Sequence, residues 1–385
     1  MSAPAKNQAA ISPLLSARRI VLKIGSALLV DEATGKVRRP WLDALADDIA
    51  AARKRGQEVL IVSSGAIAVG RLHLGLTGGQ GWRTLRLEEK QAAAATGQSR
   101  LTHAYEEALA RHGITVAQVL LTYDDTEQRR KHLNARGTLG ELLRLNAVPV
   151  INENDTVATE EIRFGDNDRL AARVAQMTSA DALILFSDID GLYTGDPRKD
   201  KAAQHLPEVT EIGGEIEAMA GKAAPGYSSG GMVTKLAAAR IAMSAGCRMA
   251  IADGRGMNPL KALIEGARCT WFMPAASPPA ARKGWIAGSL NAAGTVVVDD
   301  GAAAALGKGK SLLPAGVVAV EGAFERGDAV LVKNRAGKLL ARGLVAYSSL
   351  DCQRIIGHKS GEIAAILGYR GRDEMIHRDD LVLES

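Results

Sequence analysis

Strand-like and helix-like patterns of apolar residues alternate along the first two thirds of the chain. The first apolar run, Arg19–Ile24, is rich in aliphatic residues and stops at Gly25. Apolar residues then recur at helical spacing, at Leu42, Leu45, Ile49 and Ala52. Further strand-like runs, each preceded by a helical stretch, are found at 58–62, 114–121, 147–151, 181–186 and 247–251. Near-continuous apolar strands interleaved with helices predict an α/β fold, with a mostly parallel sheet covered by helices on both faces.

The pattern changes after a stretch rich in proline and alanine at 274–280. Short strands separated by glycine turns follow, at 295–298, 317–320, 329–332 and 339–346. The last two, joined by a turn at 334–337, have the pattern of a β-hairpin. We therefore expect a disordered extension over 1–16, an α/β domain over 17–274, a linker over 275–281 and a small, mostly β domain with its tail over 282–385.

Composition limits the classes of protein that need to be considered. The chain has 385 residues, of which 46% are hydrophobic and 24% charged, so it can build the core of a globular protein. Its three cysteines form no CxxC pair and indicate a reducing compartment. No run approaches the ~18 apolar residues of a membrane span, so no membrane partner is expected. We expect a cytoplasmic protein, with a transit peptide at the basic N-terminus as the less favoured alternative.

The charge balance does not favour nucleic acid as a partner. A net charge of +5 is modest for this length and permits anionic ligands without demanding them. Residues 282–385 hold 14 Lys and Arg against 12 Asp and Glu. Since a phosphate backbone is bound by a clear excess of basic residues, RNA binding by the C-terminal domain is only an alternative.

Polar turns follow the predicted strands, and ligands of a parallel sheet lie beyond the carboxyl ends of its strands. Lys23 and Gly25 lie at the end of the first strand, and Ser63 lies at the end of the second. The segment Ser187–Arg198 follows a later strand, and Ser229–Lys235 is a glycine-rich loop that opens a helix. Backbone N–H groups at a helix start, beside an ammonium group, are typical of a phosphate site.

A further polar constellation lies between these turns. Ile151–Asp155 follows the strand at 147–151, and Phe164–Asp168 comes shortly after it. Their carboxylates and amides could line one small-molecule pocket, and the structural alternative is a set of turns with a helix cap. No Walker A motif is present, since Gly309–Ser311 ends like one but Ala304 stands where the first glycine must be.

Six motifs in the chain resemble those of the glutamate 5-kinases, in the amino-acid kinase superfamily. In order, they are VLKIGS, VSSGAIAVG, PVINENDTV, FGDNDRLAARVA, LFSDIDGLYTGDPR and SGGMVTK. The resemblance covers roughly residues 17–270, and the remainder is similar to the PUA domain that many bacterial members carry. Ser187 and Ser229 stand where the family often has threonine, and both keep a hydroxyl group.

The resemblance implies the three-layer α/β/α amino-acid kinase fold followed by a PUA domain. It implies ATP-dependent phosphorylation of the γ-carboxylate of L-glutamate to L-glutamyl 5-phosphate, the first step of proline biosynthesis. The implied glutamate site is Ser63, Asn152, Asp155 and Asn167. The implied nucleotide site is Lys23, Gly25, Ser187, Asp188, Ser229, Gly230, Gly231, Met232, Val233, Thr234 and Lys235. Homodimers or homotetramers, feedback inhibition by proline and contact with the next enzyme of the pathway are implied as well.

The chemistry of this reaction agrees with the residues. A carboxylate with a pKa of about 4.3 is already ionised at neutral pH and needs no general base. None of the seven histidines lies in the six motifs. Lys23 and Lys235 would neutralise the charge that builds up in the transition state, with Asp168 pairing with both. We expect Mg²⁺ to be carried on the nucleotide phosphates, because the motifs contain no dedicated carboxylate cage.

A kinase of the N-acetylglutamate type is the alternative enzyme. The free α-ammonium group of glutamate requires an anionic partner, and Asp155 supplies one. An acetylated substrate would leave that carboxylate desolvated and unpaired, at roughly 1–3 kcal/mol or more. The residues therefore favour free glutamate as the substrate.

Overall fold

The computed structural model describes residues 13–31, 34–76, 85–157, 167–220, 231–288 and 292–384. Contacts within the chain divide it into two compact units, Met1–Pro278 and Pro279–Ser385. Each unit has its own sheet and its own hydrophobic core. Within the described ranges, no helix combines the length and the apolar character that crossing a membrane requires.

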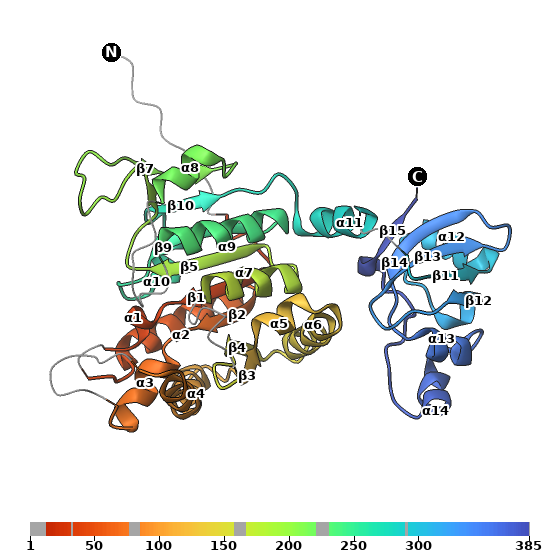
Figure 1. The fold of residues 1–385 in the computed structure, drawn as a ribbon, viewed down its shortest axis with the longest axis horizontal. Coiled ribbons are helices and arrows are strands. Elements are labelled where there is room, and N and C mark those ends of the chain that lie inside the picture. Colours follow the sequence, from red (N-terminus) through yellow and green to blue (C-terminus); the bar gives the residue numbers. More distant parts are fainter. Residues whose placement is uncertain are drawn as a thin grey trace, which may run out of the picture. The chain divides into compact units, whose positions relative to one another are not determined.

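The described part of the first unit contains an eight-stranded sheet in the order β3-β4-β2-β1-β5-β9-β10-β8 (Figure 1). Its strands are β1 (Arg19–Ile24), β2 (Glu58–Ser63), β3 (Val116–Leu121), β4 (Val148–Glu153), β5 (Ala182–Ser187), β8 (Glu208–Val209), β9 (Arg248–Asp253) and β10 (Cys269–Phe272). From β3 to β9 all neighbours are parallel, whereas β10 is antiparallel to β9. The predicted, mostly parallel sheet is confirmed.

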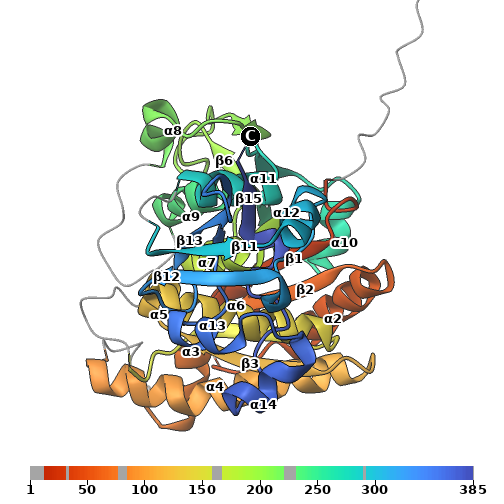
Figure 2. The ribbon, with the colours of Figure 1, turned by 90° about the vertical axis from the view of Figure 1, so that its right-hand side faces the viewer.

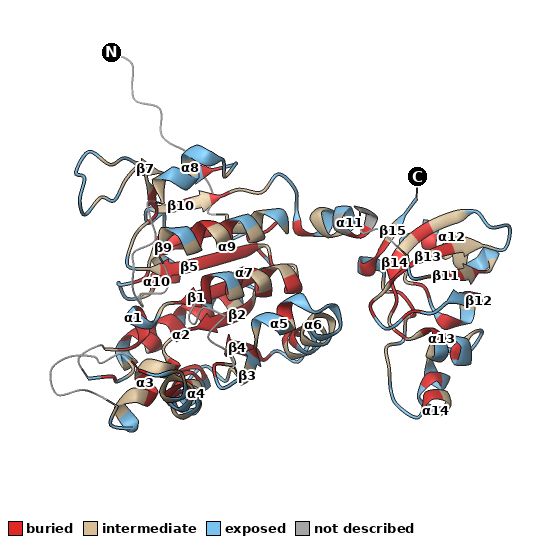
Figure 3. Ribbon diagram, in the orientation of Figure 1, coloured by how far each residue is buried: buried red, intermediate tan, exposed pale blue. Residues whose placement is uncertain are grey.

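Helices cover both faces of this sheet (Figure 1). They are α1 (Ser26–Leu29), α2 (Arg39–Lys54), α3 (Ala66–His73), α4 (Leu87–Ala110), α5 (Tyr123–Glu127), α6 (Arg129–Arg144), α7 (Asn167–Thr178), α8 (Gly214–Met219), α9 (Met232–Ser244) and α10 (Pro259–Ile264). One core lies between the sheet and α2, α4 and α10, and the other lies between the sheet and α6, α7 and α9. This is the three-layer α/β/α arrangement, and Figure 3 shows its central strands as buried.

Alternation along β1 decides which layer each of its side chains meets. Ile20 and Leu22 belong to the core under α2 and α4, whereas Val21 belongs to the core under α7 and α9. Successive side chains of a strand point to opposite faces, so Lys23 lies on the same face as Val21. The lysine at the end of β1 is therefore directed toward α7 and α9.

The second unit contains a five-stranded sheet in the order β12-β11-β13-β14-β15, counted over its described residues. Figure 2 labels β11, β12, β13 and β15 of this sheet. Its strands are β11 (Gly294–Val298), β12 (Val317–Gly322), β13 (Ala329–Asn334), β14 (Leu339–Leu344) and β15 (Leu381–Leu383). The helices that accompany it are α11 (Pro278–Gly288), α12 (Asp300–Gly307), α13 (Ser349–Ile355) and α14 (Ile363–Leu367). β13 and β14 are antiparallel, which confirms the predicted hairpin.

Two segments predicted to lack regular structure are partly ordered. Residues 1–12 of the predicted extension lie outside the described residues. Leu14 is fully buried, because its apolar side chain joins the core of the first unit. Gln57 donates from Nε2 to the carbonyl oxygen of Leu14 at 2.8 Å. In the predicted linker over 275–281, α11 begins at Pro278, a residue that favours the first turn of a helix. Residues 13–16 and 278–281 are therefore structured, and the domain boundaries themselves stay predictions.

Candidate active site

Seven of the predicted site residues lie where β1, β2, β4 and β5 end: Lys23, Gly25, Ser63, Asn152, Asp155, Ser187 and Asp188. In the register of the sheet, Ile24 is paired with Ser63 and with Phe186, so these strand ends are level. Val62 is paired with Ile151, which brings Asn152 level with Ser63. Parallel strands present their carboxyl ends at one edge of a sheet, and the loops that follow them meet there.

Asp168 forms ion pairs with two lysines from distant parts of the chain. Its Oδ1 lies 2.7 Å from Nζ of Lys23, and its Oδ2 lies 3.1 Å from Nζ of Lys235. Thr234 donates from Oγ1 to the same Oδ2 at 3.0 Å. Only 1% of Asp168 is exposed. Burial alone would raise the pKa of Asp168, but the charges of Lys23 and Lys235 outweigh it and hold the pKa below its ordinary value.

The local structure explains why these three charges meet. Lys23 is directed toward the layer that contains α7 and α9, Asp168 lies in the first turn of α7, and Lys235 lies in the first turn of α9. One carboxylate between two ammonium groups leaves an excess of positive charge. Together with the N–H groups of the helix start, this charge favours an anion.

The predicted phosphate segment Ser229–Lys235 is only partly described. Ser229 and Gly230 lie outside the described residues. Gly231 is the N-cap residue of α9, and Met232–Lys235 forms its first turn. Gly25 directly follows β1, and a Cβ atom there would lie 3.9 Å from Nζ of Lys23. A side chain at position 25 would therefore lie in contact with that ammonium group.

Asn167, beside Asp168 at the start of α7, belongs to a chain of buried side-chain amides. Its Nδ2 donates to Oδ1 of Asn152 at 3.1 Å and to Oγ of Ser64 at 2.7 Å. Asn152 in turn donates from Nδ2 to Oε1 of Gln98 at 2.7 Å. The Oδ1 of Asn167 is buried and has no hydrogen-bond partner among the described residues. Buried acceptors are normally paired, so this atom is a candidate acceptor for a donor from a ligand.

Ser63 and Asp155 complete the predicted substrate residues. Ser63 is fully buried, with its Oγ 3.0 Å from the hydroxyl of Tyr105. Asp155 is 8% exposed, and its carboxylate makes no hydrogen bond or ion pair within the described part of the chain. Burial, together with the negative charge of Glu153, raises the pKa of Asp155 to about 7. A cation beside this carboxylate would favour its ionised form.

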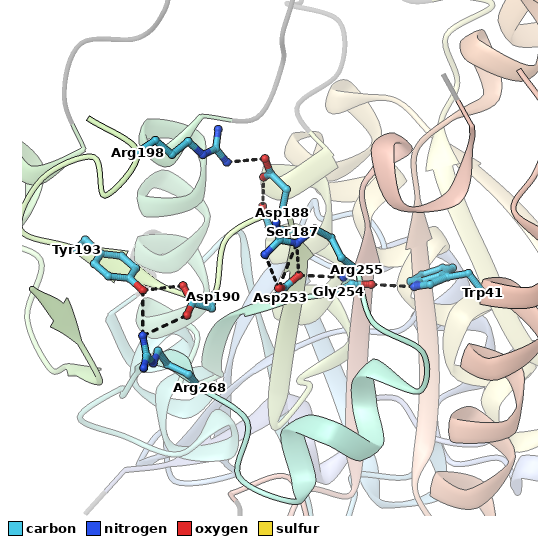
Figure 4. A network of polar contacts seen from close by, with 10 residues as sticks. All are labelled: Trp41, Ser187, Asp188, Asp190, Tyr193, Arg198, Asp253, Gly254, Arg255 and Arg268. Atoms are coloured by element: carbon cyan, nitrogen blue, oxygen red, sulfur yellow. Dashed lines mark hydrogen bonds and ion pairs between the residues drawn. The ribbon is translucent and has the colours of Figure 1, made fainter. Parts of the chain in front are cut away.

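The turn after β5 is held by a network of polar contacts (Figure 4). Ser187 donates from Oγ to Oδ1 of Asp188 at 3.2 Å, and Oδ2 of Asp188 lies 2.6 Å from Nη2 of Arg198. Arg198 comes from the loop between β6 (Leu192–Tyr193) and β7 (His205–Leu206). Burial acts to raise the pKa of Asp188, but the hydrogen bond and charge of Arg198 hold it below its ordinary value.

The neighbouring strand end supports the same turn. The N–H of Gly254 donates to the carbonyl oxygen of Ser187 at 2.9 Å. Trp41 of α2 donates from Nε1 to the carbonyl oxygen of Gly254 at 2.8 Å (Figure 4). Ser187 and Asp188, predicted to contact a nucleotide, therefore lie in a turn that is already formed.

Sequence reasoning missed the side chains that support the site from the helices. Gln98 and Tyr105 of α4 contact the ends of β4 and β2, and Trp41 of α2 contacts Gly254 after β9. None of the three lies in the six motifs. Gln98 and Tyr105 are seven residues apart, on the face that α4 buries. A polar side chain at a buried helical position is a usable signal, but it does not identify the partner.

Known proteins match this chain over nearly its whole length. The amino acid kinase family matches residues 18–253, and the PUA domain matches residues 294–367. A glutamate 5-kinase of Paramagnetospirillum magneticum is 67% identical over 374 residues, covering 97% of this chain and 100% of that protein. One of Rhodospirillum rubrum is 62% identical over 365 residues, covering 95% of this chain and 96% of that protein. A solved carbamate kinase of Giardia lamblia, bound to AMP-PNP, is 17% identical with a TM-score of 0.48, covering 68% of this chain and 99% of that one.

Proposed function

The chain belongs to the amino acid kinase family and, within it, to the glutamate 5-kinases, and we propose that it phosphorylates L-glutamate at this edge of the sheet. The reaction transfers the γ-phosphoryl group of ATP to the γ-carboxylate of glutamate. It gives L-glutamyl 5-phosphate and is the first step of proline biosynthesis. The observation that carries the proposed site is the buried centre in which Asp168 bridges Lys23 and Lys235.

The proposed chemistry needs charge stabilisation rather than proton transfer. A γ-carboxylate oxygen attacks the γ-phosphorus, and the bond from that phosphorus to the bridging oxygen of ADP breaks. No proton moves, because a carboxylate with a pKa of about 4.3 is already ionised at neutral pH. Two anions must approach each other, so Lys23 and Lys235 offset the negative charge of the transition state. Asp168 positions both ammonium groups, at 2.7 and 3.1 Å.

The ATP phosphates are proposed to lie between Lys23 and the first turn of α9. The N-cap residue Gly231 has no side chain that could occupy the N–H groups of that turn. These N–H groups and Lys235 then bind the phosphate oxygens, as at other helix starts. Ser187 and Asp188 are proposed to contact the rest of the nucleotide from the turn after β5.

Glutamate is proposed to bind on the side of the buried amides. Its α-ammonium group would pair with Asp155 and donate to Oδ1 of Asn167, the buried acceptor without a partner among the described residues. Ser63 and Asn152 would complete the pocket from the ends of β2 and β4. Support comes from the burial of all four side chains, since buried polar groups favour a ligand that satisfies them.

Magnesium is proposed to be carried by the phosphate oxygens of ATP, where it would offset phosphate charge. Among the described residues, no group of three or more His, Cys, Asp or Glu could hold a metal ion. Asp168, the carboxylate of the ion-paired centre, is already bound by two lysines.

Regulation and assembly are proposed from the family membership. Proline carries an α-ammonium and an α-carboxylate group, as glutamate does, so it would compete for Asp155 and inhibit. The protein is proposed to be a cytoplasmic homodimer or homotetramer that can contact the next enzyme of the pathway. Inhibition by proline that is competitive with glutamate would support the shared pocket, and inhibition independent of glutamate concentration would contradict it.

Acyl phosphate formation, trapped with hydroxylamine, tests the proposed function. Glutamate and N-acetylglutamate are compared side by side with ATP and Mg²⁺. We expect hydroxamate from glutamate, and little or none from N-acetylglutamate, which lacks the cation that Asp155 requires. A higher rate with N-acetylglutamate, or no hydroxamate from either, would contradict the proposal.

A further inference from the structure

Helix α4 directs two polar side chains to the strand ends that line the proposed glutamate pocket. Gln98 reaches Asn152 at the end of β4, and Tyr105 reaches Ser63 at the end of β2. Both side chains are buried, and neither lies in the turns that carry the substrate residues. Their spacing of seven residues puts them on one face of the helix.

The hydrogen bonds from Gln98 onward have a direction. Oε1 of Gln98 accepts from Nδ2 of Asn152, which leaves Oδ1 of Asn152 to accept from Nδ2 of Asn167. The same Nδ2 also donates to Oγ of Ser64 at 2.7 Å and lies 3.4 Å from the carbonyl oxygen of Ser63, so Oδ1 of Asn167 is the acceptor that faces no partner among the described residues. An amide has one donor end and one acceptor end, so the first orientation in this series determines the last.

Close contact between α3 and α4 brings Gln98 within hydrogen-bond distance of Asn152. A Cβ atom on Gly97 would lie 1.8 Å from the carbonyl oxygen of Ala66, the first residue of α3. A Cβ atom on Gly70 would lie 1.8 Å from the carbonyl oxygen of Ala93 on α4. The two helices therefore touch through their backbones, directly after the loop that holds Ser63 and Ser64. Larger residues at either glycine would separate α4 from that loop.

We propose that Gln98 is a positioning residue that determines the amino-group specificity of the site. It orients Asn152, which orients Asn167 so that Oδ1 rather than Nδ2 meets the α-ammonium group of the substrate. This inference rests on the proposed function and adds a residue to it. Without the acceptor at position 98, the amide of Asn152 loses its fixed orientation. Asn167 is then held only by Ser64 and by the long contact to the carbonyl oxygen of Ser63, and it presents Oδ1 to the ammonium group less consistently.

The test compares glutamate with glutarate, which has the same two carboxylates and no amino group. Gln98→Met removes the acceptor at similar size, and Gln98→Glu keeps an acceptor. Thr102→Val is the matched control, because Gln98 contacts Thr102 through Nε2 at 3.3 Å and not through Oε1. Thermal melts check that each variant folds, and Gln98→Ala replaces the methionine variant if that one does not fold.

For Gln98→Met we expect the KM for glutamate to rise roughly 10- to 100-fold, the range for a buried polar group left unpaired. The KM for ATP should stay within about twofold, and the preference for glutamate over glutarate, as a ratio of kcat/KM, should fall by about tenfold or more. Gln98→Glu and Thr102→Val should keep that ratio within about threefold of the wild type. If folded Gln98→Met keeps the wild-type preference for glutamate over glutarate, the role of Gln98 is overturned, and the proposed function is not affected. No acyl phosphate from the wild-type protein would overturn the proposed function and this inference together.

Discussion

Asp155 should make glutamate binding depend on pH, because it must be ionised to pair with the α-ammonium group. Burial and the charge of Glu153 raise its pKa to about 7 in the ligand-free protein. Between about pH 5.5 and 7.5 the carboxylates of glutamate are ionised and its ammonium group is protonated. Below its pKa, Asp155 must therefore release a proton when glutamate binds.

The size of the effect follows from the pKa. With a value of about 7, roughly three quarters of the sites are ionised at pH 7.5, and only about 3% at pH 5.5. The bound ammonium group holds the carboxylate ionised, so the apparent Kd should rise roughly 25-fold between these two pH values. Such a change is far above the error of a calorimetric titration.

Isothermal titration calorimetry with glutamate, in buffers of different ionisation enthalpy, measures both the affinity and the proton release. Asp155→Asn is the control, since an amide cannot titrate. It should bind glutamate more weakly, by about 2–5 kcal/mol for a lost buried charge pair, and nearly equally at both pH values. A wild-type Kd that is the same at pH 5.5 and 7.5, with no proton released, would refute the pairing of Asp155 with the ammonium group.

Four further outcomes are expected. Lys23→Ala and Lys235→Ala should each lower kcat roughly 10²–10³-fold with little change in the KM for glutamate, and steady-state kinetics that show a change in KM alone would contradict this. Asp168→Asn should lower both kcat and the melting temperature, because two buried ammonium groups lose their shared partner at about 3–5 kcal/mol; wild-type values of both would oppose the assignment. Asp155→Asn should raise the melting temperature of the ligand-free protein at about pH 8 and change it little near pH 4. The raised folded-state pKa destabilises the protein as pH rises toward 7, by up to about 4 kcal/mol, and an unchanged melt at pH 8 would argue against this burial penalty. A chain ending after Pro278 should melt cooperatively and form acyl phosphate, since the candidate residues all precede it; a folded but inactive product would assign the second unit a part in catalysis.

The long strands of the first unit could be predicted because each carries a run that is long enough to show a pattern. β1 and β4 lie within one or two residues of the expected ranges. β8 was not predicted, since it has two residues and exists through the pairing of Val209 with Phe272 of β10. A two-residue strand has no periodicity, so only tertiary contact determines it.

In the candidate site, too, residues that depend on tertiary contact could not be predicted from the sequence. The sequence indicated Lys23 because it ends a strand, and Lys235 because it opens a helix after glycines. Gln98 and Tyr105 carry no such local signal, because their partners lie 54 and 42 positions away along the chain. The structure shows that α4 buries these polar groups, and their contacts with Asn152 and Ser63 show what they orient.

In the proposed reaction, a γ-carboxylate oxygen of glutamate attacks the phosphorus held near Lys23, Asp168 and Lys235. The most direct test follows that oxygen, using glutamate labelled with ¹⁸O in its γ-carboxylate, ATP and hydroxylamine. Hydroxylamine attacks the carbonyl carbon of the acyl phosphate, so the bridging oxygen leaves with the phosphate. We expect one ¹⁸O atom in each phosphate, released at the rate of hydroxamate formation and far more slowly by Asp168→Asn. Release of unlabelled phosphate would show that another acceptor takes the phosphoryl group, and it would contradict attack by the γ-carboxylate.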